Sequence, residues 1–526
     1  MSQFSDLPVE ILPTILHRLS RYQDLWACCL ASRIFYELAT PVLYQWIYVF
    51  SWRKNGKEKV RRLFDTLASC PHLARYVEIL GEAGHAIIDA TKTAHSSLFL
   101  CLELRECHRL MSTDTVNRGV SHCVNLQKCV WTRDGTLTSE TLGTLRANCP
   151  QLKVLELNGN SSTYYDPTLL VQFSSLTNLS VIMPDRAFVN AFPEWIKATG
   201  HSLKSISLIC KSSPLIDDEM MKHIAAHSTK LEQLHLIGTP HVTDAGVAAV
   251  VAGSPSLISI SFDGGKRISV GSGEKEPPEH DSRHGSHSAR GKGTQELRSL
   301  SLEGVSPHFD MKSLSLTIAR RQALRHLSTL SITQPSHVSP TDFFPALTSI
   351  LSMCPLEYFQ IWTPGGELGR KGSVLTYDFV QSLVQTHGSR LKKFAVQRME
   401  TSLEIVNLVC RGCPALEQLY IVLKYCDADI LASHLRRLSV LHTLHISYTL
   451  NCTNPILPQH QSAIISLVRR CTSSLKLVGI LTRVFEIQRR WILISKEPIL
   501  WEDDPEISLL PYSGSQIPEA FLVMKA

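Results

Sequence analysis

The chain has 526 residues, of which 44% are hydrophobic and 19% are charged, so it can bury a large core. Its formal net charge is only +6, with acidic residues dispersed among basic ones, and this balance gives no indication of a nucleic-acid partner. The N-terminus lacks the pattern of a signal peptide, and no stretch reaches the roughly 18 apolar residues of a membrane span. We expect an intracellular protein, cytoplasmic or nuclear, without a membrane or nucleic-acid partner.

The first fifty residues predict three short helices. Apolar residues follow Pro8 at helical spacing, and Pro13 indicates that regular helix begins only near that position. A second helix is expected over residues 25–30 and a third over residues 34–38, before Pro41 interrupts it. A segment this short cannot bury so much apolar surface by itself, so we expect a partner to cover it.

This segment, residues 1–48, resembles a fungal-type F-box. The resemblance rests on Leu7-Pro8-x-Glu10-Ile11, on Leu30-x-Ser32-Arg33-x-Phe35, and on the Pro-x-Leu-Tyr that begins at Pro41. It implies the substrate-recognition subunit of an SCF-type cullin-RING ubiquitin ligase, which docks on a Skp-type adaptor and through it reaches cullin and RING subunits. The alternative is that these side chains pack on the rest of the chain. The adaptor contacts that the resemblance implies are Leu7, Pro8, Ile11, Leu12, Ile15, Leu19, Leu25, Leu30 and Phe35.

Residues 49–69 form a basic connection. Six Lys and Arg residues lie between Arg53 and Arg62, a pattern compatible with contact to a membrane or to nucleic acid. We favour a solvated helix face, because Val60 and Leu67 share helical spacing beside the charges and aromatic residues do not interleave with them.

Residues 70–484 repeat one unit, which is clearest from Leu231 to Phe262. The unit opens with L-x-x-L-x-L, in which Leu234 and Leu236 are two apart and share the buried face of a strand. A turn follows, and then a short amphipathic helix that begins near Asp244. We take the first leucine of each unit as its marker. The markers, most of them about 24 to 30 residues apart, are Leu73, Leu126, Leu152, Leu176, Leu203, Leu231, Leu257, Leu297, Leu327, Leu356, Leu391, Leu416, Leu441 and, less regularly, Leu475.

The repeated unit resembles the longer, strand-plus-helix form of the leucine-rich repeat. The fold class implied is α/β: helical F-box first, then a solenoid whose concave side is a parallel sheet and whose convex side carries helices. Residues 263–296 are rich in Gly, Ser, Pro and charge and are expected to be a disordered insertion. Residues 485–526 lose the repeat and are expected to cap the open end of the core.

No metal or cofactor is expected. Cysteines that precede proline recur at one repeat position, which indicates buried, reduced thiols at helix ends. A zinc site from Cys101, Cys107, His108, Cys123 and Cys129 is an alternative, but the cysteine spacing is wider than zinc sites use. Metal binding by His280, His284 and His287 in the insertion is a second alternative to a plain polar loop.

The sequence contains no catalytic motif, so we expect a non-catalytic protein. Specificity should come from side chains between the core positions of each strand, which face away from the helices. In the middle repeats this floor is small and polar: Ser205, Ser207, Gln233, His235, Ser259, Ser261, Ser299, Ser301, Thr329, Ser331 and Thr333.

Later repeats carry aromatic residues at the floor positions, and exposed aromatics are typical binding anchors. We expect target binding by Tyr358, Gln360, Trp362, Lys393, Gln418, Tyr420 and His445. The alternative is that a loop or the C-terminal cap covers them. No arginine occupies these floor positions, which argues against a phosphorylated target segment gripped by the sheet. The competing functional class is a non-proteolytic repeat scaffold.

Overall fold

The chain divides into two compact units, each described by itself. The first comprises Met1–Leu236 and Ala252–Ser254, and the second comprises Ile237–Val251 and Pro255–Ala526. The computed structural model describes residues 9–19, 22–50, 56–83, 113–210, 213–263, 297–303, 325–334, 338–363, 374–424, 428–449, 461–481, 483–490, 493–496, 499–501 and 505–512.

The first unit begins with a small helical domain. A 3-10 turn, η2 (Val9–Ile11), leads into α1 (Leu12–Leu16), which has Pro13 in its first turn as expected; α2 (Tyr22–Ala31) and α3 (Arg33–Gln45) follow. The Ser32 side chain caps α3 by accepting a hydrogen bond from the backbone N–H of Phe35 at 3.2 Å. The expected interruption at Pro41 is wrong: α3 continues to Gln45, since a proline removes only one backbone donor from the helix.

The sheet starts earlier than the sequence indicates. β1 (Trp46–Phe50) follows α3 directly and pairs in parallel with β2 (Ile79–Ala83), so the first strand lies inside the stretch divided between the helical domain and the basic connection. The connection contains a helix, α4 (Gly56–Ser69), as expected. The rest of the first unit alternates short helices and strands: α5 (Pro71–Ala74), α6 (Thr113–Ser121), β3 (Lys128–Trp131), α7 (Ser139–Asn148), β4 (Val154–Asn158), η4 (Pro167–Gln172), β5 (Asn178–Ile182), α8 (Arg186–Thr199), β6 (Ser205–Ile209), α9 (Asp218–His227) and β7 (Gln233–Ile237).

In the second unit, helices and strands alternate from β10 to β15, after three described strands in succession, and antiparallel strands close the unit. β15 pairs antiparallel with β16, and β16 pairs antiparallel with β19, so the antiparallel part begins just before the expected capping segment, residues 485–526, and continues into it. Its elements are α10 (Asp244–Gly253), β8 (Ser259–Asp263), β9 (Ser299–Glu303), β10 (Thr329–Thr333), α12 (Pro340–Leu351), β11 (Tyr358–Trp362), α13 (Tyr377–His387), β12 (Lys393–Gln397), α14 (Leu403–Gly412), β13 (Gln418–Leu423), α15 (Ala428–Leu435), β14 (Thr443–Tyr448), α16 (Gln461–Arg470), β15 (Leu477–Ile480), β16 (Arg483–Arg490), β17 (Leu493–Lys496), β18 (Ile499–Trp501) and β19 (Glu506–Pro511).

The leucine markers locate the strands. From Leu126 to Leu475, each marker stands two residues before the first residue of a strand. Leu73 is the exception, because it lies in α5, and the buried Val77 holds the marker position before β2. The predicted class, α/β with N-terminal helices followed by a repeat solenoid, is confirmed, whereas the insertion at 264–296 and its histidines lie outside the described residues.

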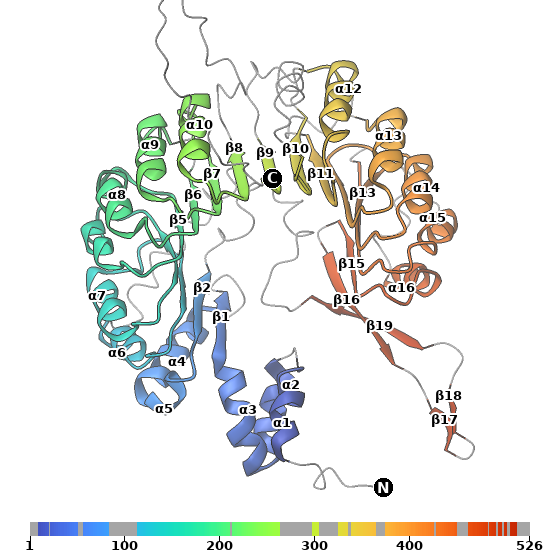
Figure 1. The fold of residues 1–526 in the computed structure, drawn as a ribbon. Coiled ribbons are helices and arrows are strands. Elements are labelled where there is room, and N and C mark those ends of the chain that lie inside the picture. Colours follow the sequence, from blue (N-terminus) through green and yellow to red (C-terminus); the bar gives the residue numbers. More distant parts are fainter. Residues whose placement is uncertain are drawn as a thin grey trace, which may run out of the picture. The chain divides into compact units, whose positions relative to one another are not determined.

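Within each unit the repeat helices lie on one face of the sheet (Figure 1). The opposite face of the sheet is called the helix-free face below. Side chains alternate between the two faces along each strand, so the leucines of the repeat face the helices and the residues between them face away.

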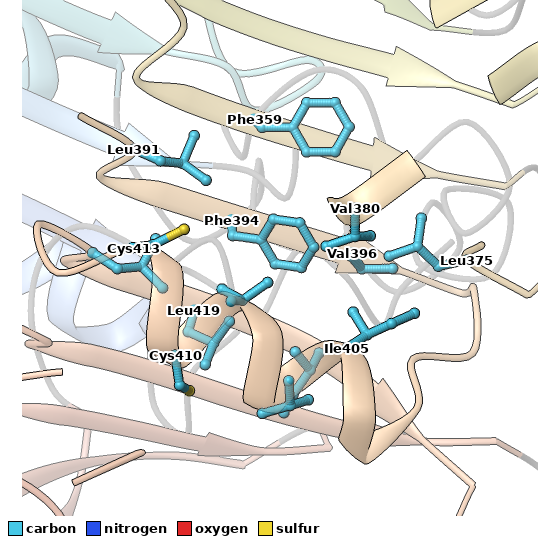
Figure 2. Packing of buried hydrophobic residues seen from close by; sticks show 14 of the residues in the cluster. Phe359, Leu375, Val380, Leu391, Phe394, Val396, Ile405, Cys410, Cys413 and Leu419 are labelled. Atoms are coloured by element: carbon cyan, nitrogen blue, oxygen red, sulfur yellow. The ribbon is translucent and has the colours of Figure 1, made fainter. Parts of the chain in front are cut away.

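The core of the second unit is a ladder of apolar side chains between sheet and helices (Figure 2). Phe359 and Phe394 occupy the same position on neighbouring strands, with ring centroids 6.1 Å apart, and Phe379 of α13 lies 5.7 Å from Phe359. Cys410 and Cys413 are buried in the same cluster. Burial raises the pKa of both thiols to about 12, consistent with cysteines that act as small apolar side chains.

Glycine ends two successive helices where they come closest. A Cβ on Gly388, just after α13, would lie 2.2 Å from the carbonyl oxygen of Gly412, and a Cβ on Gly412 would lie 2.1 Å from Cγ1 of Val384. Neither position can hold a larger residue unless the two repeats separate. The close stacking of these repeats therefore depends on residues without side chains.

Asp185 connects two consecutive repeats of the first unit. Its carboxylate caps α8 by accepting a hydrogen bond from the backbone N–H of Phe188 at 2.8 Å. It also accepts bonds of 2.6 to 2.9 Å from the backbone N–H and the hydroxyl of both Ser161 and Ser162. Partial burial alone would raise the pKa of Asp185, but these bonds outweigh it and lower the pKa below its ordinary value.

We expect Asp185→Ala to destabilise the first unit by about 2 kcal/mol, since it removes a helix cap and orphans serine donors. Chemical denaturation and hydrogen exchange at Ser161 and Ser162 measure this. Asp217→Ala is the matched control. In the described part of the chain, the Asp217 carboxylate caps α9 with a single hydrogen bond, from the backbone N–H of Met220, so this substitution should lower the free energy of unfolding by about half as much.

The same carboxylate predicts a pH dependence. The pKa of Asp185 is lower in the folded chain than in the unfolded one, so its stabilisation is present at neutral pH and is lost as the pH falls through the folded value. An Asp185→Asn chain should lose less stability than the parent over that acidic range. Equal losses in the two proteins would contradict this role.

Candidate protein-interaction surfaces

The N-terminal helical domain has a small core of its own. Leu16, Leu25 and Ala39 are buried together, and Leu19 and Phe35 pack partly buried against them. Leu12 is also buried, at 6% exposure. Of the adaptor contacts that the resemblance implies, Leu12 and Leu25 therefore belong mainly to the interior of the domain.

Other members of that set face solvent. Ile11 and Ile15 are each 40% exposed and Leu30 is 68% exposed, whereas Leu7 and Pro8 lie outside the described residues. These positions are available to a partner. Contact with an adaptor remains a prediction for the set as a whole.

The structure adds Tyr22 and Trp26 to the predicted contact Leu30, and the three form an exposed apolar row on α2. Tyr22, Trp26 and Leu30 are 64%, 58% and 68% exposed, and their spacing of four residues places them on one side of the helix. The sequence carries the signal as that spacing, on a side of the helix different from that of the inward-facing Leu25. Other exposed apolar residues of the domain are Val9, Ile34 and Tyr36.

The basic helix α4 is paired internally. Glu58 accepts hydrogen bonds from Arg61 and Arg62 at 2.7 to 2.9 Å, and Arg61 also bonds Asp65. Hydrogen bonds from the two arginines lower the pKa of Glu58 to about 2. Phe64 on the same helix is buried, which fits a solvated helix with one apolar face packed inward.

Cys123 and Cys129, two members of the alternative zinc set, are buried, and burial raises the pKa of the Cys123 thiol to about 12. Cys101, Cys107 and His108 lie outside the described residues. In the part of the chain that the structure describes, no three His, Cys, Asp or Glu residues are grouped as a metal site would require.

On the helix-free face of the second unit, strand pairing without offset arranges side chains in rows. One row runs through Ser331, Gln360, Ala395, Tyr420 and His445, one residue from each of β10 to β14. It continues through Gly479 of β15 and Val484 of β16. We call these seven residues the middle row.

Most of the predicted target-binding residues are less accessible than expected. Gln360, Lys393, Tyr420 and His445 are 8%, 9%, 5% and 2% exposed. Only Tyr358, Trp362 and Gln418 are partly exposed. The expectation of a row of freely exposed anchors is therefore wrong for Tyr420 and its buried neighbours.

The buried members contact one another. Lys393 Nζ donates to Gln360 Oε1 at 3.0 Å and lies 5.6 Å from the ring centroid of Tyr420. The Tyr420 and His445 rings are 6.0 Å apart, and His445 Nε2 donates to the carbonyl oxygen of Leu481 at 2.9 Å. Gly479 makes room for the imidazole, because a Cβ there would lie 3.0 Å from the ring.

The C-terminal strands explain part of this burial. Val484 of β16 packs with Ala395 and Tyr420, and Tyr512 just after β19 packs against the same cluster. The backbone N–H of Tyr512 donates to the carbonyl oxygen of Val484 at 3.0 Å. The alternative reading, in which the C-terminal segment covers the aromatics, thus holds for Tyr420.

The polar floor of the middle repeats lies where the sequence predicts. Ser205 and Ser207 of β6 have the alternating positions of the helix-free face in the first unit, and Ser259, Ser299 and Thr329 form a row in the second. All five are partly exposed, whereas Ser261 and Thr333 are buried.

Among the described residues, no helix has the length and apolar character needed to cross a bilayer.

Three solved structures are similar to parts of this chain. A chain of the yeast Rad7–Elc1 complex is similar over 82% of this chain and 89% of its own, with 12% identity and a TM-score of 0.41. The leucine-rich repeat-containing protein LegL7 from Legionella pneumophila is similar over 66% of this chain and 90% of its own, with 12% identity and a TM-score of 0.30.

The third is the TLR13–ssRNA13 complex, with 14% identity and a TM-score of 0.35; the match covers 68% of this chain but only 47% of the TLR13 chain. A family model gives the more specific finding, because it matches residues 4–49, the stretch that contains the small helical core and the exposed row on α2. The protein therefore carries an F-box-like domain at its N-terminus, followed by a leucine-rich-repeat solenoid.

Proposed function

We propose that this protein is the substrate-recognition subunit of an SCF-type cullin-RING ubiquitin ligase. The F-box-like domain docks on a Skp-type adaptor and through it reaches cullin and RING subunits, while the helix-free face of the solenoid binds a target protein. The observation that carries the proposal is the exposed apolar row on the F-box-like domain, Tyr22, Trp26 and Leu30.

Exposed apolar side chains of this size favour a permanent partner. The row stands beside a core of only a few buried residues, so the domain presents much of its apolar surface to solvent. Burying each such side chain contributes roughly 1.5–3 kcal/mol to association. Aromatic anchors near the centre of an interface are typical of tight protein complexes.

The proposed mechanism is tethering. In this role the protein holds the target so that a target lysine reaches the conjugating enzyme at high effective concentration, and other subunits carry out the chemistry. We place this activity in the cytoplasm or nucleus, because the F-box resemblance implies a cullin-based ligase and such ligases act there. This mechanism requires no cofactor or metal.

Leu30→Glu should greatly weaken adaptor binding, because it places a charged side chain in the proposed interface, where apolar side chains make the contacts. Leu30 is 68% exposed, so the change should leave the fold intact. Binding of the purified chain to a Skp-type adaptor, measured by calorimetry, should weaken at least a hundredfold.

Ile430→Glu is the matched control, because Ile430 is 46% exposed on α15 of the solenoid and lies far along the chain from the F-box-like domain. It should bind the adaptor like the parent. Adaptor binding that survives Leu30→Glu, or is absent in the parent, would contradict the proposed docking.

Reconstitution separates a ligase subunit from a non-proteolytic scaffold. With adaptor, cullin, RING subunit and conjugating enzyme, the parent chain should support ubiquitin transfer to a captured target, and Leu30→Glu should not. A parent chain that binds adaptor and cullin but never increases transfer would favour the scaffold.

A second substitution addresses target binding. Tyr358 and Gln418 are partly exposed neighbours of one row on the helix-free face, joined through Lys393 by strand pairing. Tyr358→Ala with Gln418→Ala should remove most proteins that are ubiquitinated in a parent-dependent way, measured by quantitative proteomics, while adaptor binding persists. An unchanged set of ubiquitinated proteins would place the target site elsewhere.

A further inference from the structure

The carboxyl ends of β10, β11 and β12 bring a group of polar residues together in the second unit. Thr333 of β10 pairs in register with Trp362 of β11. The backbone N–H of Gln334 donates to the carbonyl oxygen of Trp362 at 2.9 Å. The hydroxyl of Thr363 donates to the carbonyl oxygen of Arg398, which directly follows β12, also at 2.9 Å. The backbones of Thr333, Gln334, Trp362 and Arg398 thus lie close together at the carboxyl ends of three neighbouring strands.

Three of these residues hold buried polar atoms that have no hydrogen-bond partner among the residues that the structure describes. They are the hydroxyl of Thr333, the amide oxygen of Gln334 and the indole N–H of Trp362. Thr333 and Gln334 are only 1% and 3% exposed. An unsatisfied buried polar group costs roughly 1–3 kcal/mol, so three at one edge point to a ligand that supplies the missing partners.

Arg398 adds a positive charge at the same edge. Its side chain is half-buried, and within the described part of the chain it forms no ion pair, although Glu400 stands two residues away. Partial burial lowers the pKa of its guanidinium, with no carboxylate opposing the effect. A half-buried guanidinium without a counterion favours an anionic ligand.

The backbone of Arg398 is strained. Its φ is 56°, in the left-handed region that Gly and Asn adopt more readily than Arg. Glycine or asparagine would stabilise this turn better, so retaining arginine there has a cost of about 1 kcal/mol. Strain of this kind concentrates at binding sites.

We propose that the carboxyl ends of β10–β12 form a binding site for a carboxylate of an acidic peptide segment, held by the side chains of Arg398, Trp362, Thr333 and Gln334. The site rests on the proposed function, since the segment would belong to the target. The Gln334 amide presents a donor after a 180° flip, which exchanges its oxygen and nitrogen positions.

A single guanidinium favours a carboxylate over a phosphate. One positive charge balances one carboxylate, whereas a phosphate near neutral pH would leave excess negative charge in a largely buried place. The other three side chains contribute neutral hydrogen bonds. They orient the carboxylate without adding charge.

The test uses the full chain labelled with 5-fluorotryptophan, whose ¹⁹F spectrum reports the 8 tryptophans. Trp362→Phe assigns the Trp362 resonance by removing it. Acetate and a tetraglutamate peptide should shift that resonance saturably, and a tetraglutamine peptide should not. Failure of both anions to shift it would overturn the site, and tighter binding of phosphate than of acetate would overturn the choice of carboxylate.

Arg398→Asn separates binding from folding, because asparagine suits a φ of 56° and the variant should be at least as stable as the parent. Its affinity for tetraglutamate should fall at least tenfold. Arg390→Asn, at an exposed arginine in the same unit, is the control and should bind normally. Unchanged affinity in Arg398→Asn would refute the site, while adaptor binding by the same variant reports independently on the proposed function.

Discussion

Strand pairing without offset is the constraint on which the solenoid depends. Leu330, Phe359, Phe394, Leu419 and Leu444 occupy one position on five successive parallel strands, so they form a continuous apolar row under the helices. The same pairing arranges the residues between them in rows on the opposite face. A slip of one residue would exchange core and floor, so core packing and surface composition are set together.

The F-box-like domain and the solenoid use apolar residues in opposite ways. In the solenoid, most large apolar side chains of the described strands are buried. In the F-box-like domain, the inward side of α2 supports a minimal core while its outward side presents Tyr22, Trp26 and Leu30. Apolar surface exposed in this way favours a partner that covers it, and the adaptor docking proposed above would supply that partner.

The repeat architecture could be predicted from sequence because its signal is local and repeated. Leucine spacing correctly predicts the first residue of thirteen strands. The prediction from Leu73 is wrong, because Val77, also apolar, holds the equivalent position before β2. Burial of the floor could not be predicted in this way. Tyr420 is covered by Val484 of β16 and by Tyr512, which directly follows β19; these antiparallel strands lack the repeat pattern, and neither spacing nor composition indicates the contact.

The strand pattern predicts the floor positions but not the residues that follow each strand. The floor positions contain no arginine, but Arg398 lies one residue beyond the end of β12. Its left-handed backbone and its lack of an ion pair in the described chain are properties of three-dimensional structure. Sequence periodicity therefore describes the regular part of this face. It does not describe the residues just beyond the ends of the strands, where Arg398 lies.

The direct passage from α3 into β1 has a practical consequence for dissecting the protein. Because β1 pairs with β2 along its whole length, a truncation that removes residues 1–48 would also remove most of a sheet strand. The edge of β2 would then present unpaired backbone groups, which promote aggregation by edge-to-edge pairing. Loss of activity in such a truncated chain would report on a damaged solenoid as much as on a missing F-box, and point substitutions on α2 avoid this ambiguity.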